Sequence, residues 1–221
     1  MLYKLLQRFG HLALLLMSSL AMAVEEPRYE VISAQGDFEL RRYPALLVAQ
    51  TVVEGDMDQA SRKGFQLLAD FIFGNNQASE GAASAKIAMT APVTIEPQSA
   101  KIAMTAPVTL QAQAGLSETG PWRVHFVMPS KYTLASIPKP RNPAVQLREL
   151  PPQWFVAHKF SGFTTESRVE AKTQEAVQWA RQQSLAALSP AQLARYDPPW
   201  TLPMFRRNEI LIEVSAPTKS P

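Results

Sequence analysis

The chain of 221 residues contains no cysteine. This absence excludes disulfide bonds, thiolate metal sites and a cysteine nucleophile, so the hydrophobic core alone must hold the fold together. Several enzyme signatures are also missing: there is no G-x-S-x-G elbow, no H-E-x-x-H pair, no P-loop and no G-x-G-x-x-G turn. We therefore expect a protein that is not an enzyme. A Ser-His-Asp arrangement assembled only in space would leave no such signature.

A large excess of charge of one sign is missing as well. The formal net charge is +3, and the first 23 residues contribute Lys4 and Arg8 but no acidic residue, which leaves 20 basic and 19 acidic residues in the rest. Nucleic-acid-binding domains usually carry a clearly basic surface. We therefore expect no nucleic-acid partner.

The first 23 residues have the features of an export signal. Lys4 and Arg8 form a positive start, residues 12–20 are apolar, and Ala21-Met22-Ala23 fits the small-x-small cleavage rule. The apolar run is shorter than the roughly 20 residues that span a bilayer, and no cysteine follows it for a lipid anchor. We predict cleavage after Ala23, a periplasmic location without a stable membrane anchor, and one domain over residues 24–221. The alternative is an uncleaved N-terminal anchor.

The remaining chain alternates strand-like and helix-like segments. A helix is predicted from its cap Asp56, with Gln59 three positions later, to Gly74, and a second helix over residues 165–184. The second helix should bury Val169, Ala176 and Ala180. Strands are predicted over residues 29–33, 38–43, 46–54, 122–128, 145–150, 154–160 and 209–214. This order indicates an α+β domain with two similar halves, most economically a bent antiparallel sheet or open barrel flanked by two helices.

Residues 84–94 and 99–109 are the same sequence, SAKIAMTAPVT. In the first copy Ile87, Met89, Ala91 and Val93 occupy every second position, and the second copy repeats this pattern around Met104. Alternation with a period of two predicts two strands with these residues facing inward. Residues 96–99 suit a turn between them, and the proline of each copy belongs at a bulge or a sheet edge.

Several segments together resemble the SOUL/haem-binding protein family. They follow the family's order and are the opening 29–43, the helix ending in FIFGNN, both KIAMTAPV repeats, WRVHFVMPSKYTL, FSGF and ARYDPPWTLPMFRRNEI. The resemblance implies a distorted antiparallel β-barrel with two helices in a pseudo-twofold arrangement. It also implies non-covalent binding of haem, or of a related tetrapyrrole such as metal-free porphyrin, in a shallow hydrophobic cleft, as a carrier or buffer.

The resemblance places the tetrapyrrole against the first helix, with a basic residue near its propionates. Arg62 matches that position and shares a helix face with Phe65 and Ala69. A guanidinium group suits this role because it pairs with both oxygens of a carboxylate. A solvated surface arginine is the alternative, and Asp70 stands where some family members have a basic residue.

Methionine offers a soft, polarizable surface to a flat apolar ligand. Met89 and Met104 are therefore candidate ligand contacts, although core packing is the more common role. Met204 lies in a loop with Trp200 and Phe205, and these three residues either plug the end of the sheet or line a pocket.

His125 and His158 are the only histidines after residue 23. Neutral imidazole is a common haem ligand, so both are weak candidates for binding the iron. A hydrogen-bonding residue within a strand is the more common role, and the lack of a C-x-x-C-H motif excludes covalent haem.

Arg206 and Arg207 either present two cations beside a cleft or, as we favour, tie the last strand to the turn at Asp197. Two other functions stay open. One is a binding module of the same fold for another small apolar ligand, and the other is a hydrolase or tetrapyrrole-modifying enzyme.

Overall fold

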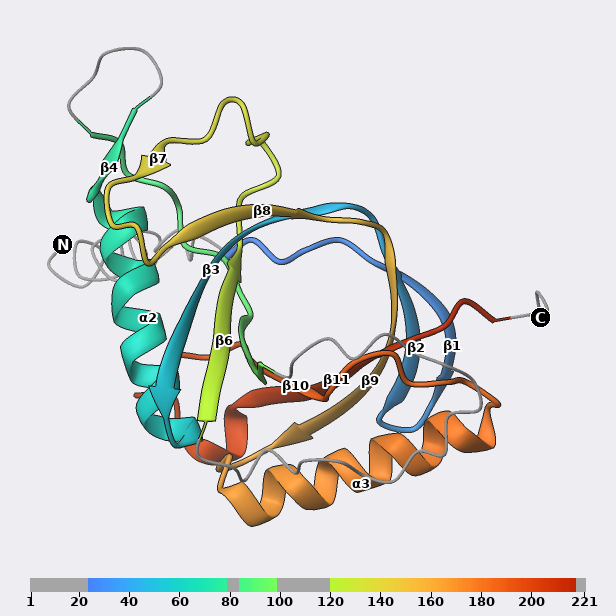
Figure 1. The fold of residues 1–221 in the computed structure, drawn as a ribbon. Coiled ribbons are helices and arrows are strands. Elements are labelled where there is room, and N and C mark those ends of the chain that lie inside the picture. Colours follow the sequence, from blue (N-terminus) through green and yellow to red (C-terminus); the bar gives the residue numbers. More distant parts are fainter. Residues whose placement is uncertain (1–23, 79–83, 99–119, 218–221) are drawn as a thin grey trace, which may run out of the picture.

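A large curved sheet carries two long helices on its outer face (Figure 1). The structure is a computed structural model that describes residues 24–78, 84–98 and 120–217. Its helices are α2 (Met57–Phe73) and α3 (Glu166–Gln182), with a short 3-10 turn η1 (Pro203–Phe205). Its strands are β1 (Glu30–Gln35), β2 (Phe38–Tyr43), β3 (Leu46–Gly55), β4 (Asn76–Gln77), β5 (Val93–Pro97), β6 (Gly120–Val127), β7 (Lys139–Pro140), β8 (Gln146–Leu150), β9 (Gln153–Ser161), β10 (Gln192–Arg195) and β11 (Arg207–Val214).

Nine of these strands form one antiparallel sheet in the order β1-β2-β9-β11-β10-β5-β6-β3-β8. Strands β4 and β7 form a separate small pair. The same succession occurs twice, because β3, α2, β5 and β6 are followed later by β9, α3, β10 and β11 with equivalent pairings. Among the described strands, β1 and β8 are the two edges and do not pair with each other, so the α+β prediction is confirmed but the sheet is open rather than a closed barrel.

Both helices begin and end close to the predicted residues. Asp56 caps α2 by accepting a hydrogen bond from the backbone N–H of Gln59 at 2.8 Å, and Gly74 ends it with a φ of 130° that favours glycine. Thr165 is the N-cap residue of α3. The predicted inner residues of α3 are all buried: Val169, Ala176 and Ala180. No helix in the described part of the chain is both long and apolar enough to cross a membrane.

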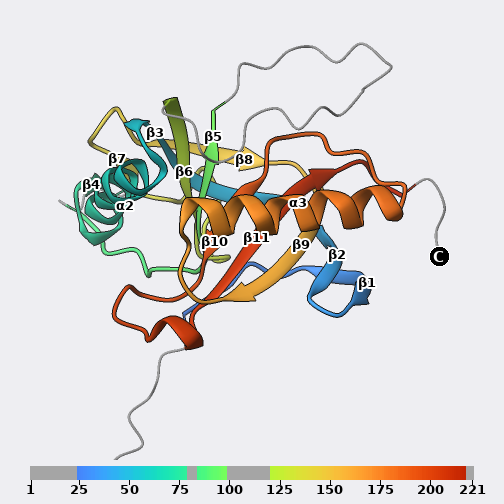
Figure 2. The same cartoon turned by 90° about the horizontal axis from the view of Figure 1, so that it is seen from below.

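The helices bury the apolar face of the sheet, because alternate residues of each strand point to opposite sides. Helix α2 packs on β3 and β6, and α3 packs on β9 and β11, as Figure 2 shows from below. The packing of α2 is close: a Cβ atom added at Gly64 would lie 2.5 Å from Val124 Cγ2. The core between the helices and the sheet includes Leu40, Leu68, Phe71, Ile95, Trp122, Val124, Phe126, Val156, Val169, Ile210 and Ile212.

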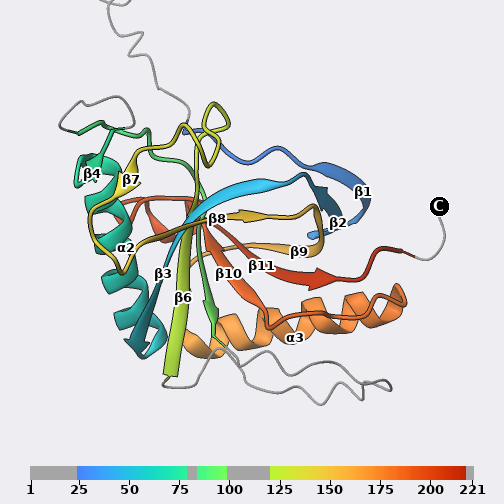
Figure 3. The same ribbon diagram turned by 45° about the horizontal axis from the view of Figure 1, so that its top comes forward.

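The other face of the sheet, which we call the inner face, lies on the concave side away from both helices (Figure 3). It buries a polar network as well as apolar residues. Arg41 Nη1 and Nη2 donate to Glu209 at 2.6 and 3.0 Å, and the Tyr196 hydroxyl donates to the same carboxylate at 2.8 Å. Arg41 also lies 4.2 Å from the centre of the Tyr29 ring. Burial raises the pKa of Tyr43, which accepts from Arg41 Nη1, to about 12.

The first copy of the repeat departs from its prediction. Residues 84–92 lie outside the named strands, and β5 begins only at Val93 and continues through Glu96 and Pro97, where a turn was expected. Buried and exposed residues do not alternate here, because Thr90, Ala91 and Pro92 are all buried. The Thr90 hydroxyl donates to the carbonyl oxygen of Val127, and Pro92 has no N–H for a sheet. The second copy, with Met104, lies outside the described residues. The short strands β4, β7 and β10 were not predicted.

Candidate functional site

The loop between β10 and β11 exposes apolar side chains to solvent. Their exposed fractions are 83% for Trp200, 59% for Leu202, 66% for Met204 and 70% for Phe205, and that of Phe163, on the β9–α3 connection, is 60%. We call these five residues the apolar patch. Large groups of exposed apolar residues usually mark a binding surface.

Hydrogen bonds hold this loop in place. The Asp197 carboxylate accepts from the backbone N–H of Arg207 at 2.6 Å, and Arg206 Nε donates to the carbonyl oxygen of Thr201 at 2.7 Å. The backbone N–H of Gly162 donates to the carbonyl oxygen of Pro203 at 2.9 Å, which joins the connection carrying Phe163 to the loop. The favoured interpretation of Arg206 and Arg207, that they tie the last strand to the Asp197 turn by internal ion pairs, holds only in part. The backbone of Arg207 bonds to Asp197 and the side chain of Arg206 bonds to the loop backbone, but the ion pair of Arg207 is with Glu26.

Arg195, the last residue of β10, links the apolar patch to α2. Its Nη1 donates to Ser61 Oγ on α2 at 2.6 Å, and its Nε donates at 3.2 Å to Oγ1 of Thr164, which follows Phe163 in the chain. Burial lowers the pKa of Arg195, and the charge of Asp58 on α2 opposes that effect. Arg195 therefore joins the start of the loop to the N-terminal half of α2.

The predicted ligand-contacting residues differ in how much surface they present. Arg62 is exposed, and Phe65 is 37% exposed, with its ring 5.6 Å from the ring of Phe126 beneath it. Ala69 is only 8% exposed, and Met89 is half-buried against the core. Of the predicted apolar contacts on α2, Phe65 thus offers far more surface than Ala69, and Arg195 joins this helix to the loop that carries Met204.

The two candidate histidines lie on opposite faces of the sheet. His125 is buried on the inner face beside Thr94, and burial lowers its pKa to about 4. His158 faces α3, where its ring stacks on Phe38 with 4.2 Å between ring centres. His158 Nδ1 lies 3.1 Å from the carbonyl oxygen of Lys172, and burial lowers the pKa of this histidine too. Within the described residues, no three His, Asp or Glu side chains group as metal ligands would.

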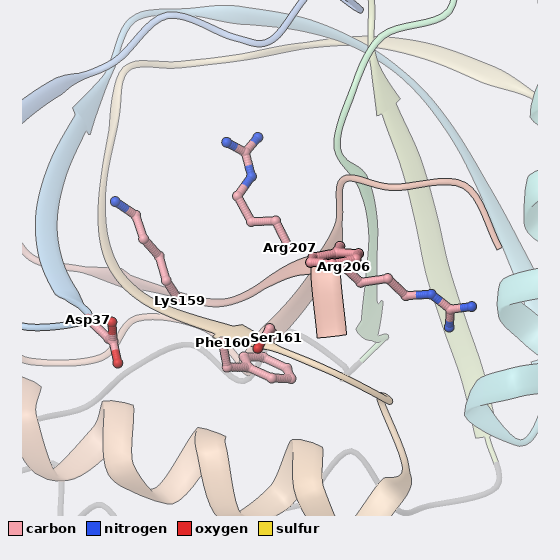
Figure 4. Close-up of a pocket in the computed structure, with 7 residues that line it drawn as sticks. Asp37, Lys159, Phe160, Ser161, Arg206 and Arg207 are labelled. Atoms are coloured by element: carbon pink, nitrogen blue, oxygen red, sulfur yellow. The ribbon is translucent and has the colours of Figure 1, made fainter. Parts of the chain in front are cut away.

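A pocket of about 380 Å³ adjoins the apolar patch at Phe205. It is a shallow, open depression on the surface rather than an enclosed cavity. Figure 4 shows Lys159 and Arg207 extending to the same side of the pocket from β9 and β11. Lys159 hydrogen-bonds Glu39, and Arg207 Nη2 lies 2.5 Å from Glu26 Oε1. The lining is Asp37, Lys159, Phe160, Ser161, Phe205, Arg206 and Arg207.

Sequence reasoning had singled out Arg206, Arg207 and the apolar loop residues, but it missed Lys159 and Glu26. Lys159 carries no motif signal, and Glu26 reaches Arg207 only through the fold. The one available signal was the alternation within residues 154–160, which places Lys159 on the same strand face as Phe155 and Ala157.

Solved structures share this fold at low sequence identity. The C-terminal domain of EcmrR matches with a TM-score of 0.55 and 11% identity over 85% of this chain and 98% of that one. A hydrolase from Listeria innocua matches with a TM-score of 0.51 and 12% identity over 83% of this chain and 94% of that one. At such identities the similarity shows the fold alone. No curated protein matches the chain.

A comparison with models of protein families identifies the family, which the structural matches do not. The model of the SOUL heme-binding protein family matches residues 24–213, which include α2, both faces of the sheet and the apolar patch. The chain belongs to the SOUL heme-binding protein family.

Proposed function

We propose that this protein binds haem or a related tetrapyrrole non-covalently and acts as its carrier or buffer. The macrocycle lies across the apolar patch and reaches the face of α2 that carries Phe65. The observation that carries this proposal is the patch itself: five large apolar side chains, each at least 59% exposed, are held by hydrogen bonds beside a helix and a cationic pocket. Family membership supports the choice of ligand.

Burial of apolar area supplies most of the affinity in this account. Covering apolar surface contributes roughly 25 cal/mol per Å², and each aromatic side chain in the patch offers a large area. An exposed ion pair between a propionate and a surface cation such as Arg62 contributes about 0–1 kcal/mol. Shape and apolar contact therefore outweigh charge in this site.

Iron ligation is not required by this arrangement. His158 is packed under α3 with its ring stacked on Phe38, and His125 is buried on the inner face, whereas the loop that carries the apolar patch is joined to α2 through Arg195. A metal-free porphyrin presents the same flat apolar faces as haem. We propose in addition that residues 1–23 direct export to the periplasm and are removed, which leaves a single binding domain that performs no catalysis.

Truncating single side chains tests where the ligand lies. Trp200→Ala and Phe65→Ala should each weaken haem binding about tenfold, because each removes apolar contact worth about 1.4 kcal/mol. Arg62→Ala should weaken it by less than about fivefold. The measurement is a titration of the mature protein with haem, followed by the Soret band, with circular dichroism to verify folding.

Leu188→Ala is the matched control, because Leu188 is also an exposed apolar residue, 42% exposed, but its backbone bonds to Glu213 at the far end of β11. It should bind haem as the unchanged protein does. Full affinity in both Trp200→Ala and Phe65→Ala would contradict the proposed position of the ligand. Loss in only one of them would place the ligand on the element that carries that residue.

A further inference from the structure

The side chain of Arg207 is positioned by an aromatic ring on which it stacks. Its guanidinium carbon lies 3.6 Å from the centre of the Tyr196 ring. Tyr196 is itself fixed, because its hydroxyl donates to Glu209, and Glu209 is held by the fully buried Arg41. A guanidinium stacked on an anchored ring presents its remaining donors in a constant direction, which suits recognition of a carboxylate.

The present partner of Arg207 is an exposed residue near the start of the described chain. Glu26 Oε1 lies 2.5 Å from Arg207 Nη2, and both side chains are 41% exposed. Arg207 Nε is buried and has no hydrogen-bond partner within the described residues. Glu26 therefore satisfies Arg207 incompletely.

The Glu26 side chain can move away from Arg207 without breaking the hydrogen bonds that hold the neighbouring backbone. The neighbouring Glu25 holds this segment, because its carbonyl oxygen accepts from the backbone N–H of Ala91 at 2.9 Å and its side chain accepts from the backbone N–H of Ser130 at 2.8 Å. Rotation of the Glu26 side chain alone would free Arg207 toward the pocket, which Lys159 and Phe205 also line.

The geometry points to Arg207 as the subsite for a carboxylate of the bound tetrapyrrole, with Glu26 as the internal carboxylate that the ligand displaces. This inference rests on the proposed function. Phe205 belongs to both the apolar patch and the pocket, so a macrocycle on the patch brings its carboxylates to the pocket mouth. The exchange replaces one carboxylate by another at Arg207, and it makes Glu26 a determinant of affinity for carboxylate-bearing ligands.

The test compares metal-free protoporphyrin with its dimethyl ester, which has the same ring but no carboxylate. Glu26→Gln should bind the free acid about two- to fivefold more tightly, because an exposed ion pair no longer competes. Arg207→Gln should bind the free acid about three- to tenfold more weakly. Neither substitution should change binding of the ester. Quenching of tryptophan fluorescence reports both affinities.

Glu30→Gln is the matched control, because Glu30 forms a comparable exposed ion pair with Arg42, at 2.9 Å, away from the pocket. It should change neither affinity. Equal affinity of Glu26→Gln and the unchanged protein for the free acid would overturn the inference, as would parallel shifts for acid and ester. If Arg207→Gln fails to fold, the Glu26→Gln result decides. If the ester binds and the acid shows no carboxylate effect, the inference fails and the proposed function stands; if neither porphyrin binds, both fail.

Discussion

His125 combines burial with a titratable ring, and this combination makes the stability of the protein depend on pH. It is 8% exposed on the inner face, and burial lowers its pKa to about 4, compared with about 6.5 in an unfolded chain. Below pH 6.5 the unfolded chain binds a proton that the folded protein excludes. The contribution of His125 to the free energy of unfolding is therefore complete above pH 6.5 and is lost as the pH falls toward 4.

Between pH 7.5 and pH 5.0, protonation of His125 should lower the free energy of unfolding by about 2 kcal/mol. In His125→Gln the pH-dependent decrease should be smaller by that amount. His158, whose pKa burial also lowers, contributes in the same direction in both proteins and cancels from the comparison. Urea unfolding at the two pH values measures the difference, and an identical decrease in both proteins would show that His125 does not titrate in this way.

At the scale of the element, the position of α2 depends on the absence of a side chain at Gly64. A Cβ atom there would lie 2.5 Å from Cγ2 of the fully buried Val124. Alanine favours a helix over glycine by about 1 kcal/mol, but overpacking a tight interface costs about 1–3 kcal/mol. The helix can approach β6 this closely only with glycine.

Gly64→Ala should therefore lower the free energy of unfolding by up to about 2 kcal/mol despite its better helix propensity. Gln66→Ala on the exposed face of the same helix should change it by no more than about 0.5 kcal/mol. Thermal unfolding followed by circular dichroism compares the two variants. A Gly64→Ala protein more stable than the unchanged one would mean that α2 does not pack on Val124 as described.

Elements with local signals could be predicted from the sequence, whereas elements set by distant partners could not. Asp56 and Gly74 fix the ends of α2 through hydrogen bonds and backbone geometry within the helix itself. Residues 84–92 alternate as a strand would, but the contact of Thr90 with Val127 on β6 and the burial of Pro92 override that pattern. The neighbours of this segment come from parts of the chain far away in sequence.

At the scale of the whole molecule, the open sheet separates two environments. The outer face packs against both helices, and the inner face holds the network around Arg41 and Glu209. The network could not be read from the sequence, because Arg41 and Glu209 are brought together only by the pairing of β2 and β11 with β9. The apolar loop was visible in the sequence, but the pocket beside it depends on Lys159 and Glu26, which local patterns do not connect.

The central claim is that this fold holds a tetrapyrrole by packing against its apolar faces. Parallel titrations of the mature protein with haem and with metal-free protoporphyrin test it most directly, because the two ligands differ only in the iron. Packing predicts that both bind saturably, with dissociation constants within about fivefold of each other, a difference of about 1 kcal/mol. Binding of haem with no binding of the metal-free porphyrin would show that iron ligation holds the ligand, and failure of both to bind would contradict the claim altogether.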